Sequence, residues 1–203
     1  MKGADIQKYL PKYLSAESQK ELFDDVKKFV DDDDTYKVYT TLLDGKSTIY
    51  QGDGLAGFKF YYFEKGEVKT SPGLVLSNTC DISLENDRYL PTQILYSPIV
   101  SLSKYIDLLQ KNGMFEDRIN SHIDSVRRQE ITSIFYIPEF QGRIEESVVF
   151  LDRISNMRNS AEVTSELLKD RIFTLSNFGF YLLLLKISIH FTRIREGVDR
   201  RTA

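Results

Sequence analysis

The sequence has no tryptophan, one cysteine and two histidines among its 203 residues. A single cysteine cannot form a disulfide within the chain, so a reducing, cytoplasmic setting is expected. The N-terminal segment MKGADIQKYL lacks the apolar run of a secretion signal, which agrees with that setting. The cysteine and histidines are too widely separated for a zinc site, and no phosphate-binding GxxxxGK[ST] loop is present. We therefore expect no metal and no other cofactor.

An excess of charge of one sign and a long hydrophobic run are also missing. The 27 basic and 30 acidic residues leave a net charge of −3, so no overall field attracts nucleic acid. The most apolar stretch, FYLLLLKISIHF at residues 180–191, is shorter than the about 20 residues that a membrane crossing needs. Lys186 and His190 also interrupt it. This stretch predicts a buried helix, and no membrane partner is expected.

Phenylalanine and tyrosine are plentiful, with 13 and 12 copies, and they concentrate in a region of short β-rich runs. Gly and Pro turns separate these runs, and the Ser71-Pro72-Gly73 sequence predicts a bend of the chain. Many short strands with such turns favour a partly closed barrel. The predicted strands are Tyr36–Leu43, Ser47–Gln51, Leu55–Phe63, Val68–Thr70, Leu74–Ser77, Thr92–Val100, Ile131–Ile137 and Ser147–Leu151.

Helical patterns lie before, within and after the β-rich region. A capping-box spacing at Ser18–Glu21 begins the first amphipathic helix, and the run of four aspartates at Asp31–Asp34 ends it as a solvated linker. In the last helix, apolar residues at 3.6-residue spacing predict the face that packs on the barrel: Phe180, Leu183, Leu184, Ile187 and Phe191. The domain plan is an N-terminal helical extension, 1–34, and a barrel domain, 35–203, with a helical insertion at 102–130, a helix at 162–171 and a C-terminal helix at 176–196.

Four short motifs of the β-rich region follow one another in a recognisable order. They are Gly52-Asp53, SPGLVLS at 71–77, SPIV at 97–100 and ESVVFLDRI at 146–154. This order resembles the MazF/PemK family of bacterial toxin ribonucleases, over roughly residues 47–101 and 131–157. The resemblance implies an α+β fold built on a small, strongly bent antiparallel β-barrel. It also implies a toxin-like protein of growth control or phage defence, with RNA, a neutralising or partner protein and a second copy of the chain as partners.

The catalytic pair of that family is not retained. The family places an arginine before the proline of the first strand motif and a threonine after Pro-Ile of the second, and here those positions are Ser71 and Val100. Serine cannot supply a fixed positive charge to the phosphate, and valine has no hydroxyl to bind a phosphate oxygen. The family chemistry is therefore either lost or carried by other residues.

The polar segment Asn78–Tyr89 contains the densest cluster of reactive side chains. For metal-independent RNA cleavage, Asp81 would be the base, Lys69 and Arg88 would stabilise phosphate charge, and Cys80 would shape the site. The expected substrate-binding residues around the same groove are Asp53, Ser71, Ser77, Asn78 and Thr79. In the alternative interpretation Cys80 packs as a small apolar residue, Asp81 makes an Asx turn, and the protein is a catalytically silent barrel that binds a protein or a nucleic acid.

Overall fold

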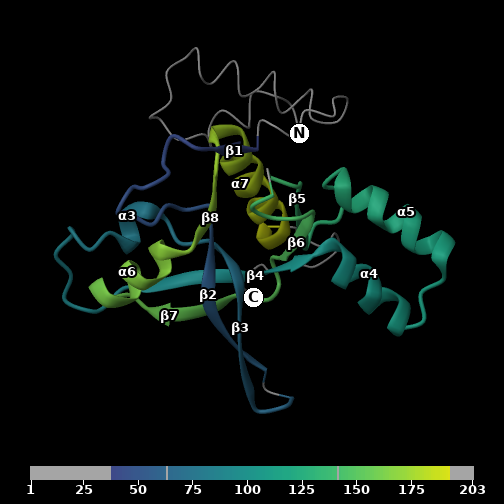
Figure 1. The fold of residues 1–203 in the computed structure, drawn as a ribbon, viewed down its shortest axis with the longest axis horizontal. Coiled ribbons are helices and arrows are strands. Elements are labelled where there is room, and N and C mark those ends of the chain that lie inside the picture. Colours follow the sequence, from purple (N-terminus) through teal and green to yellow (C-terminus); the bar gives the residue numbers. More distant parts are fainter. Residues whose placement is uncertain (1–37, 63, 141, 193–203) are drawn as a thin grey trace, which may run out of the picture. The chain divides into compact units, whose positions relative to one another are not determined.

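A computed structural model describes residues 38–62, 64–140 and 142–192, all within the unit Thr35–Ala203 (Figure 1). The predicted extension 1–34 and the end of the predicted last helix lie outside the described residues. The fold is α+β, with an antiparallel sheet of eight strands that does not close. The strands are β1 (Tyr39–Thr40), β2 (Asp53–Tyr62), β3 (Glu67–Val75), β4 (Gln93–Ser101), β5 (Ile134–Ile137), β6 (Ser147–Phe150), β7 (Ser155–Arg158) and β8 (Arg171–Leu175).

The sheet has the order β1-β8-β2-β3-β4-β6-β5, and β7 also pairs with β4. Between the strands, the described residues form five helices, of which α4 and α5 make up the predicted insertion. The Ser101 hydroxyl caps α4, and Gly113 follows the helix at a φ of 82°. The helices are α3 (Thr79–Ile82), α4 (Leu102–Lys111), α5 (Glu116–Arg127), α6 (Ala161–Lys169) and α7 (Asn177–Thr192).

Strand β4 lies at the centre of the sheet and changes partner along its length. On one side it pairs with β3, and on the other its first half pairs with β7 and its second half with β6. Pro98 lies at this change of partner, where its missing N–H costs no regular ladder bond. The predicted adjacency of the Leu74, Gln93–Val100 and Val148 segments in one sheet is therefore confirmed.

The bend predicted at Ser71-Pro72-Gly73 does not interrupt the strand, since β3 runs unbroken through these residues. The irregularity lies instead in the partner strand β2, which has a bulge between Leu55 and Phe58. Gly57 has a φ of 87° in this bulge, a conformation that glycine adopts without strain. The extra residue bends the hairpin and keeps the pairing of its outer half regular.

Two of the predicted strands are largely loop. In the described part of the first predicted strand, residues 38–43, only Tyr39–Thr40 is a strand, and Ser47–Gln51 pairs with no described strand. The loop uses a side chain in place of a sheet partner: the Arg171 guanidinium donates to the carbonyls of Leu43, at 2.7 Å, and Thr48. The backbone of this loop is therefore satisfied by a residue more than a hundred positions away, which no local pattern indicates.

The core forms two clusters on either side of the sheet's centre. In one, α3 and α6 cover β2, β3 and β4, with Phe58 stacked on Tyr96 at 4.1 Å between ring centroids. In the other, α4 and α5 cover β5 and β6, with Tyr105, Val126 and Phe150 buried among them. Figure 1 shows these two groups of helices on opposite sides of β4.

The buried face of α7 differs from the predicted one. Leu183 is 0% exposed, but Leu184 is only half-buried and Phe191 is 60% exposed. The buried positions among the described side chains of this helix are Phe178, Gly179, Leu182, Leu183 and Lys186. Lys186 fits because its ammonium donates to the carbonyls of Gln129 at 2.7 Å and Ile131 at 2.6 Å, although burial lowers its pKa to about 8. A residue that seemed to interrupt the apolar stretch thus anchors the helix.

Candidate functional site

The polar segment after β3 folds into the short helix α3 and a loop. The Asn78 carboxamide oxygen caps the helix by accepting from the Cys80 N–H at 2.9 Å, and the Thr79 hydroxyl accepts from the Gln51 N–H at 3.0 Å. Asp81 pairs with Arg88 at 3.4 Å, and the same guanidinium donates to the Cys80 carbonyl at 3.2 Å. The Cys80 thiol is free and exposed. Three of the four predicted catalytic residues therefore lie together at the surface.

Lys69, the fourth, lies apart from this group. It is in the outer half of β3, where it pairs with Glu67 at 3.3 Å and lies 5.4 Å from the Tyr62 ring. Lys69 lies six positions before Val75 along the strand, and the chain leads to α3 only after Val75. At a rise of about 3.3 Å per residue, that length of strand is roughly 20 Å. Lys69 pairs with Glu67, whereas Asp81 pairs with Arg88.

Two predicted substrate-binding residues are built into the sheet. Ser77 is buried, and its hydroxyl accepts from the Leu95 N–H at 2.7 Å and donates to the Gln93 carbonyl at 3.3 Å. Asp53 is 0% exposed. Both oxygen atoms of its carboxylate are occupied, one by the Thr174 hydroxyl at 2.6 Å and the other by the Tyr50 N–H at 2.9 Å and Arg171 at 3.2 Å. These contacts give both residues a structural role.

Burial raises the pKa of Asp53, while the hydrogen bonds from Thr174 and Tyr50 and the charge of Arg171 oppose this shift. Arg171 also lies over the Tyr50 ring at 5.6 Å. The ion pair thus joins β2 to β8 and closes the loop between β1 and β2.

The two positions that correspond to the family's catalytic pair lie on adjacent strands. The pairing of β3 with β4 ends at Gly73 and Pro98, and Ser71 and Val100 each lie two residues beyond it on these adjacent strands. Both side chains are half-buried. The two positions are therefore near one another. They differ from the family's catalytic pair in their side chains, which lack the arginine guanidinium and the threonine hydroxyl.

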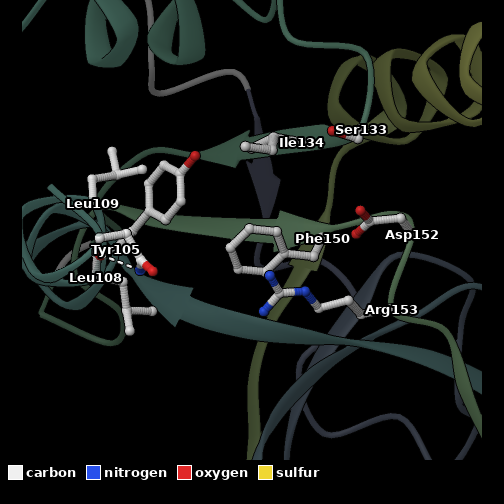
Figure 2. A pocket seen from close by; sticks show the side chains of 9 residues that line it. Tyr105, Leu108, Leu109, Ser133, Ile134, Phe150, Asp152 and Arg153 are labelled. Carbon is white, nitrogen blue, oxygen red and sulfur yellow. Dashed lines mark hydrogen bonds between the residues drawn. The ribbon is translucent and has the colours of Figure 1, made fainter. Parts of the chain in front are cut away.

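A pocket of about 410 Å³ lies between α4 and the β5–β6 hairpin (Figure 2). Its lining comes from three separated parts of the chain and includes none of the residues predicted from the sequence. The lining residues are Tyr105, Leu108, Leu109, Asn112, Ser133, Ile134, Phe150, Asp152 and Arg153. The sequence contains no motif for this pocket, because its apolar residues follow ordinary helix and strand spacing.

The pocket has an aromatic wall and a charged end. The Tyr105 ring meets the Phe150 ring edge to face at 5.5 Å, and the Arg153 guanidinium lies over the same Phe150 ring at 4.0 Å. The Tyr105 hydroxyl is hydrogen-bonded to the His122 ring at 2.8 Å, and burial raises the pKa of Tyr105. In Figure 2 the leucines of α4 and Tyr105 line one end, and Asp152 and Arg153 the other.

Among the residues that the structure describes, no group of three His, Cys, Asp or Glu side chains could hold a metal ion. No helix in residues 38–192, apart from the undescribed positions, has the length and hydropathy of a membrane span. Comparisons with protein-family models and with curated proteins found no match to this chain.

Proposed function

We propose that this protein is a non-catalytic interaction module that binds a protein partner through the outer half of the β2–β3 hairpin, here called the arm (residues 58–62 and 67–71). The observation that carries the proposal is the exposure of apolar side chains on this arm. Tyr61 and Val68 pair directly across the hairpin on one face and are 51% and 61% exposed, and Tyr62, on the other face, is 44% exposed. Tyrosine is a residue type enriched in protein interfaces, and large exposed apolar groups close together mark such sites.

The pairing of the strands makes the arm available. Strand β2 pairs with β8 only at Asp53–Leu55, and β3 pairs with β4 only at Gly73–Val75. Beyond these residues each strand of the arm has, among the described strands, only the other as a partner. Phe58 and Phe60 bury one face of the arm in the core. The outer end of the arm, residues 61–62 and 67–68, is exposed, and a two-stranded hairpin of this kind gains from a surface that covers it. Figure 1 shows it projecting beyond the helices.

The polar segment 78–89 supports a catalytic function less well than the arm supports a binding function. RNA cleavage by attack of the 2′-hydroxyl needs a base and a positive group close to the same phosphate. Asp81 and Arg88 pair with each other on an exposed surface, Lys69 lies on the arm, and the family's two catalytic positions hold Ser71 and Val100. A net charge of −3 adds no attraction for RNA.

The resemblance to the MazF/PemK toxins supplies the biological setting of the proposal. The motifs that carry it fall on β2, β3, β4 and β6, which form the middle of the sheet. We place the protein as a divergent form of that barrel, opened and extended by an insertion, in which partner binding remains and RNA cleavage is lost. Pairing with a second copy or with a neutralising protein is the kind of contact that such a relationship implies.

The absence of catalysis is tested directly with purified protein and a mixed RNA pool. We expect the wild type to release no fragments above the level of a mock purification, in the presence or absence of EDTA, and Asp81→Asn to behave identically. The measurement is denaturing gel electrophoresis of end-labelled RNA. Cleavage by the wild type that Asp81→Asn lowers by about 10²–10⁴ in rate would show that the polar segment is an active site.

The role of the arm in partner binding is tested by substitutions that replace its exposed apolar side chains with charged ones. We expect a Tyr62→Glu, Val68→Lys double variant to lose, by at least about tenfold, a partner that the wild type retains from host-cell extract. Phe115→Lys is the matched control, since this exposed aromatic residue precedes α5, outside the arm. Quantitative mass spectrometry of the bound fraction, with and without ribonuclease treatment, measures the effect. Equal recovery by the arm variant, or a partner released by ribonuclease, would contradict the proposal.

A further inference from the structure

We infer that the pocket between α4 and the β5–β6 hairpin binds a small zwitterion, namely a free α-amino acid with an apolar side chain. This inference goes beyond the interaction function and uses no residue of the arm. It rests on a partly open pocket with an aromatic wall, whose exposed end presents one positive and one negative side chain. Among the residues that the structure describes, neither of these two side chains has an ion pair or a hydrogen bond.

The inner part of the pocket suits an apolar side chain. Tyr105, Ile134 and Phe150 are buried and form its wall, and the half-buried Leu109 extends it. A volume of about 410 Å³ falls in the range of sites for small molecules, which are mostly apolar with a few polar groups that set orientation. An aliphatic or aromatic side chain bound here would be transferred from water to a site between two aromatic rings, which is favourable because its apolar surface is removed from water.

Arg153 is positioned to receive a carboxylate. Its guanidinium carbon lies 4.0 Å from the centre of the Phe150 ring, and the exposed side chain makes no ion pair or hydrogen bond with any residue in the described part of the chain. The cation–π contact holds the guanidinium beside the pocket wall, and its N–H donors are not used by the described part of the chain. A planar guanidinium with free N–H groups matches the two oxygens of a carboxylate.

Asp152 completes the charge pattern. It precedes Arg153 and also lines the pocket, and within the described ranges its carboxylate has no hydrogen bond or ion pair, not even with Arg153. In Figure 2 the two side chains leave the chain on different sides of the Phe150 ring, with Asp152 near Ser133. A ligand that carried only an anion would meet the repulsion of Asp152. A ligand with an ammonium and a carboxylate group satisfies both residues.

The test is a titration of the full chain with L-phenylalanine and two blocked analogues, followed by calorimetry and by NMR of the backbone amides. We expect L-phenylalanine to bind and to shift signals of α4, β5 and β6. N-acetyl-L-phenylalanine lacks the ammonium, and L-phenylalaninamide lacks the carboxylate, so each should bind more weakly by about tenfold or more. Glycine, which has both charges and no side chain, should not bind measurably.

Variants assign the two charges. Arg153→Gln should weaken L-phenylalanine by about tenfold or more and should not weaken the binding of L-phenylalaninamide, which lacks the carboxylate. Asp152→Asn should likewise weaken L-phenylalanine and should not weaken N-acetyl-L-phenylalanine, which lacks the ammonium. Arg158→Gln, on β7 outside the pocket, is the control and should bind like the wild type. No binding of L-phenylalanine at millimolar concentration would overturn the inference. Equal affinity for the free and acetylated forms, or an equal loss in Arg158→Gln, would overturn it as well.

Discussion

Replacing Asp53 with alanine is expected to lower the free energy of unfolding by about 3–5 kcal/mol. The carboxylate is fully buried and pairs with Arg171 at 3.2 Å, and the Arg171 side chain is itself only 7% exposed. Removing one partner leaves a buried guanidinium uncompensated, and it also removes the acceptor of the Thr174 hydroxyl and the Tyr50 N–H. Because Arg171 closes the loop after β1, the loss should spread to that loop. Urea denaturation followed by circular dichroism measures the change.

Asp44→Ala is the matched control for this experiment. Asp44 also pairs with an arginine, Arg143, at 2.8 Å, but here both side chains are more than a third exposed. The exposed fraction is 35% for Asp44 and 39% for Arg143. Surface pairs of this kind contribute about 0–1 kcal/mol, so the control should change stability little. Equal effects in the two variants would show that the Asp53 pair is solvated. If Asp53→Ala were as stable as the wild type and had lost only the binding of RNA, Asp53 would have the substrate-binding role predicted from the sequence.

The second large effect is expected in helix α7, where two neighbouring leucines should differ. Leu183→Ala should cost about 2–5 kcal/mol, because the side chain is fully buried and its removal leaves a cavity. Leu184→Ala should cost clearly less, since that side chain is only half-buried. The two variants remove the same atoms from adjacent positions of one helix, so helix propensity cancels in the comparison. Chemical denaturation of both gives the difference, and a larger loss in Leu184→Ala would restore the face predicted from the sequence.

The local signals in the sequence predicted many of the elements well. Alternating or continuous apolar residues mark β2, β4 and β6. Such features depend on residues within a few positions of one another. The same reasoning separated the α4–α5 insertion from the strands around it, because the hydrophobic period changes from two to 3.6 residues there.

The face of α7 illustrates where local pattern is insufficient. Apolar residues surround this helix, so more than one stripe satisfies the helical spacing. The choice depends on the close approach of Gly179 to the Val38 carbonyl and on the two carbonyls that accept from Lys186. These partners lie far away in the sequence, and a buried lysine next to leucines has no signature in a hydropathy pattern.

The candidate sites divide in the same way. The sequence by itself determined that the chain forms an α+β fold, and that Cys80, Asp81 and Arg88 belong to one short polar segment. Only the tertiary structure decided that Asp53 and Ser77 are buried and hold neighbouring segments together. It also decided that Lys69 lies on the arm. The pocket that Asp152 and Arg153 share with Tyr105 is likewise a product of the tertiary structure. The physical reason is that a polar residue's role depends on whether its hydrogen bonds are completed by the fold or left for a ligand. That balance is set by contacts between residues as distant as Asp53 and Arg171, and it is absent from any local stretch of sequence.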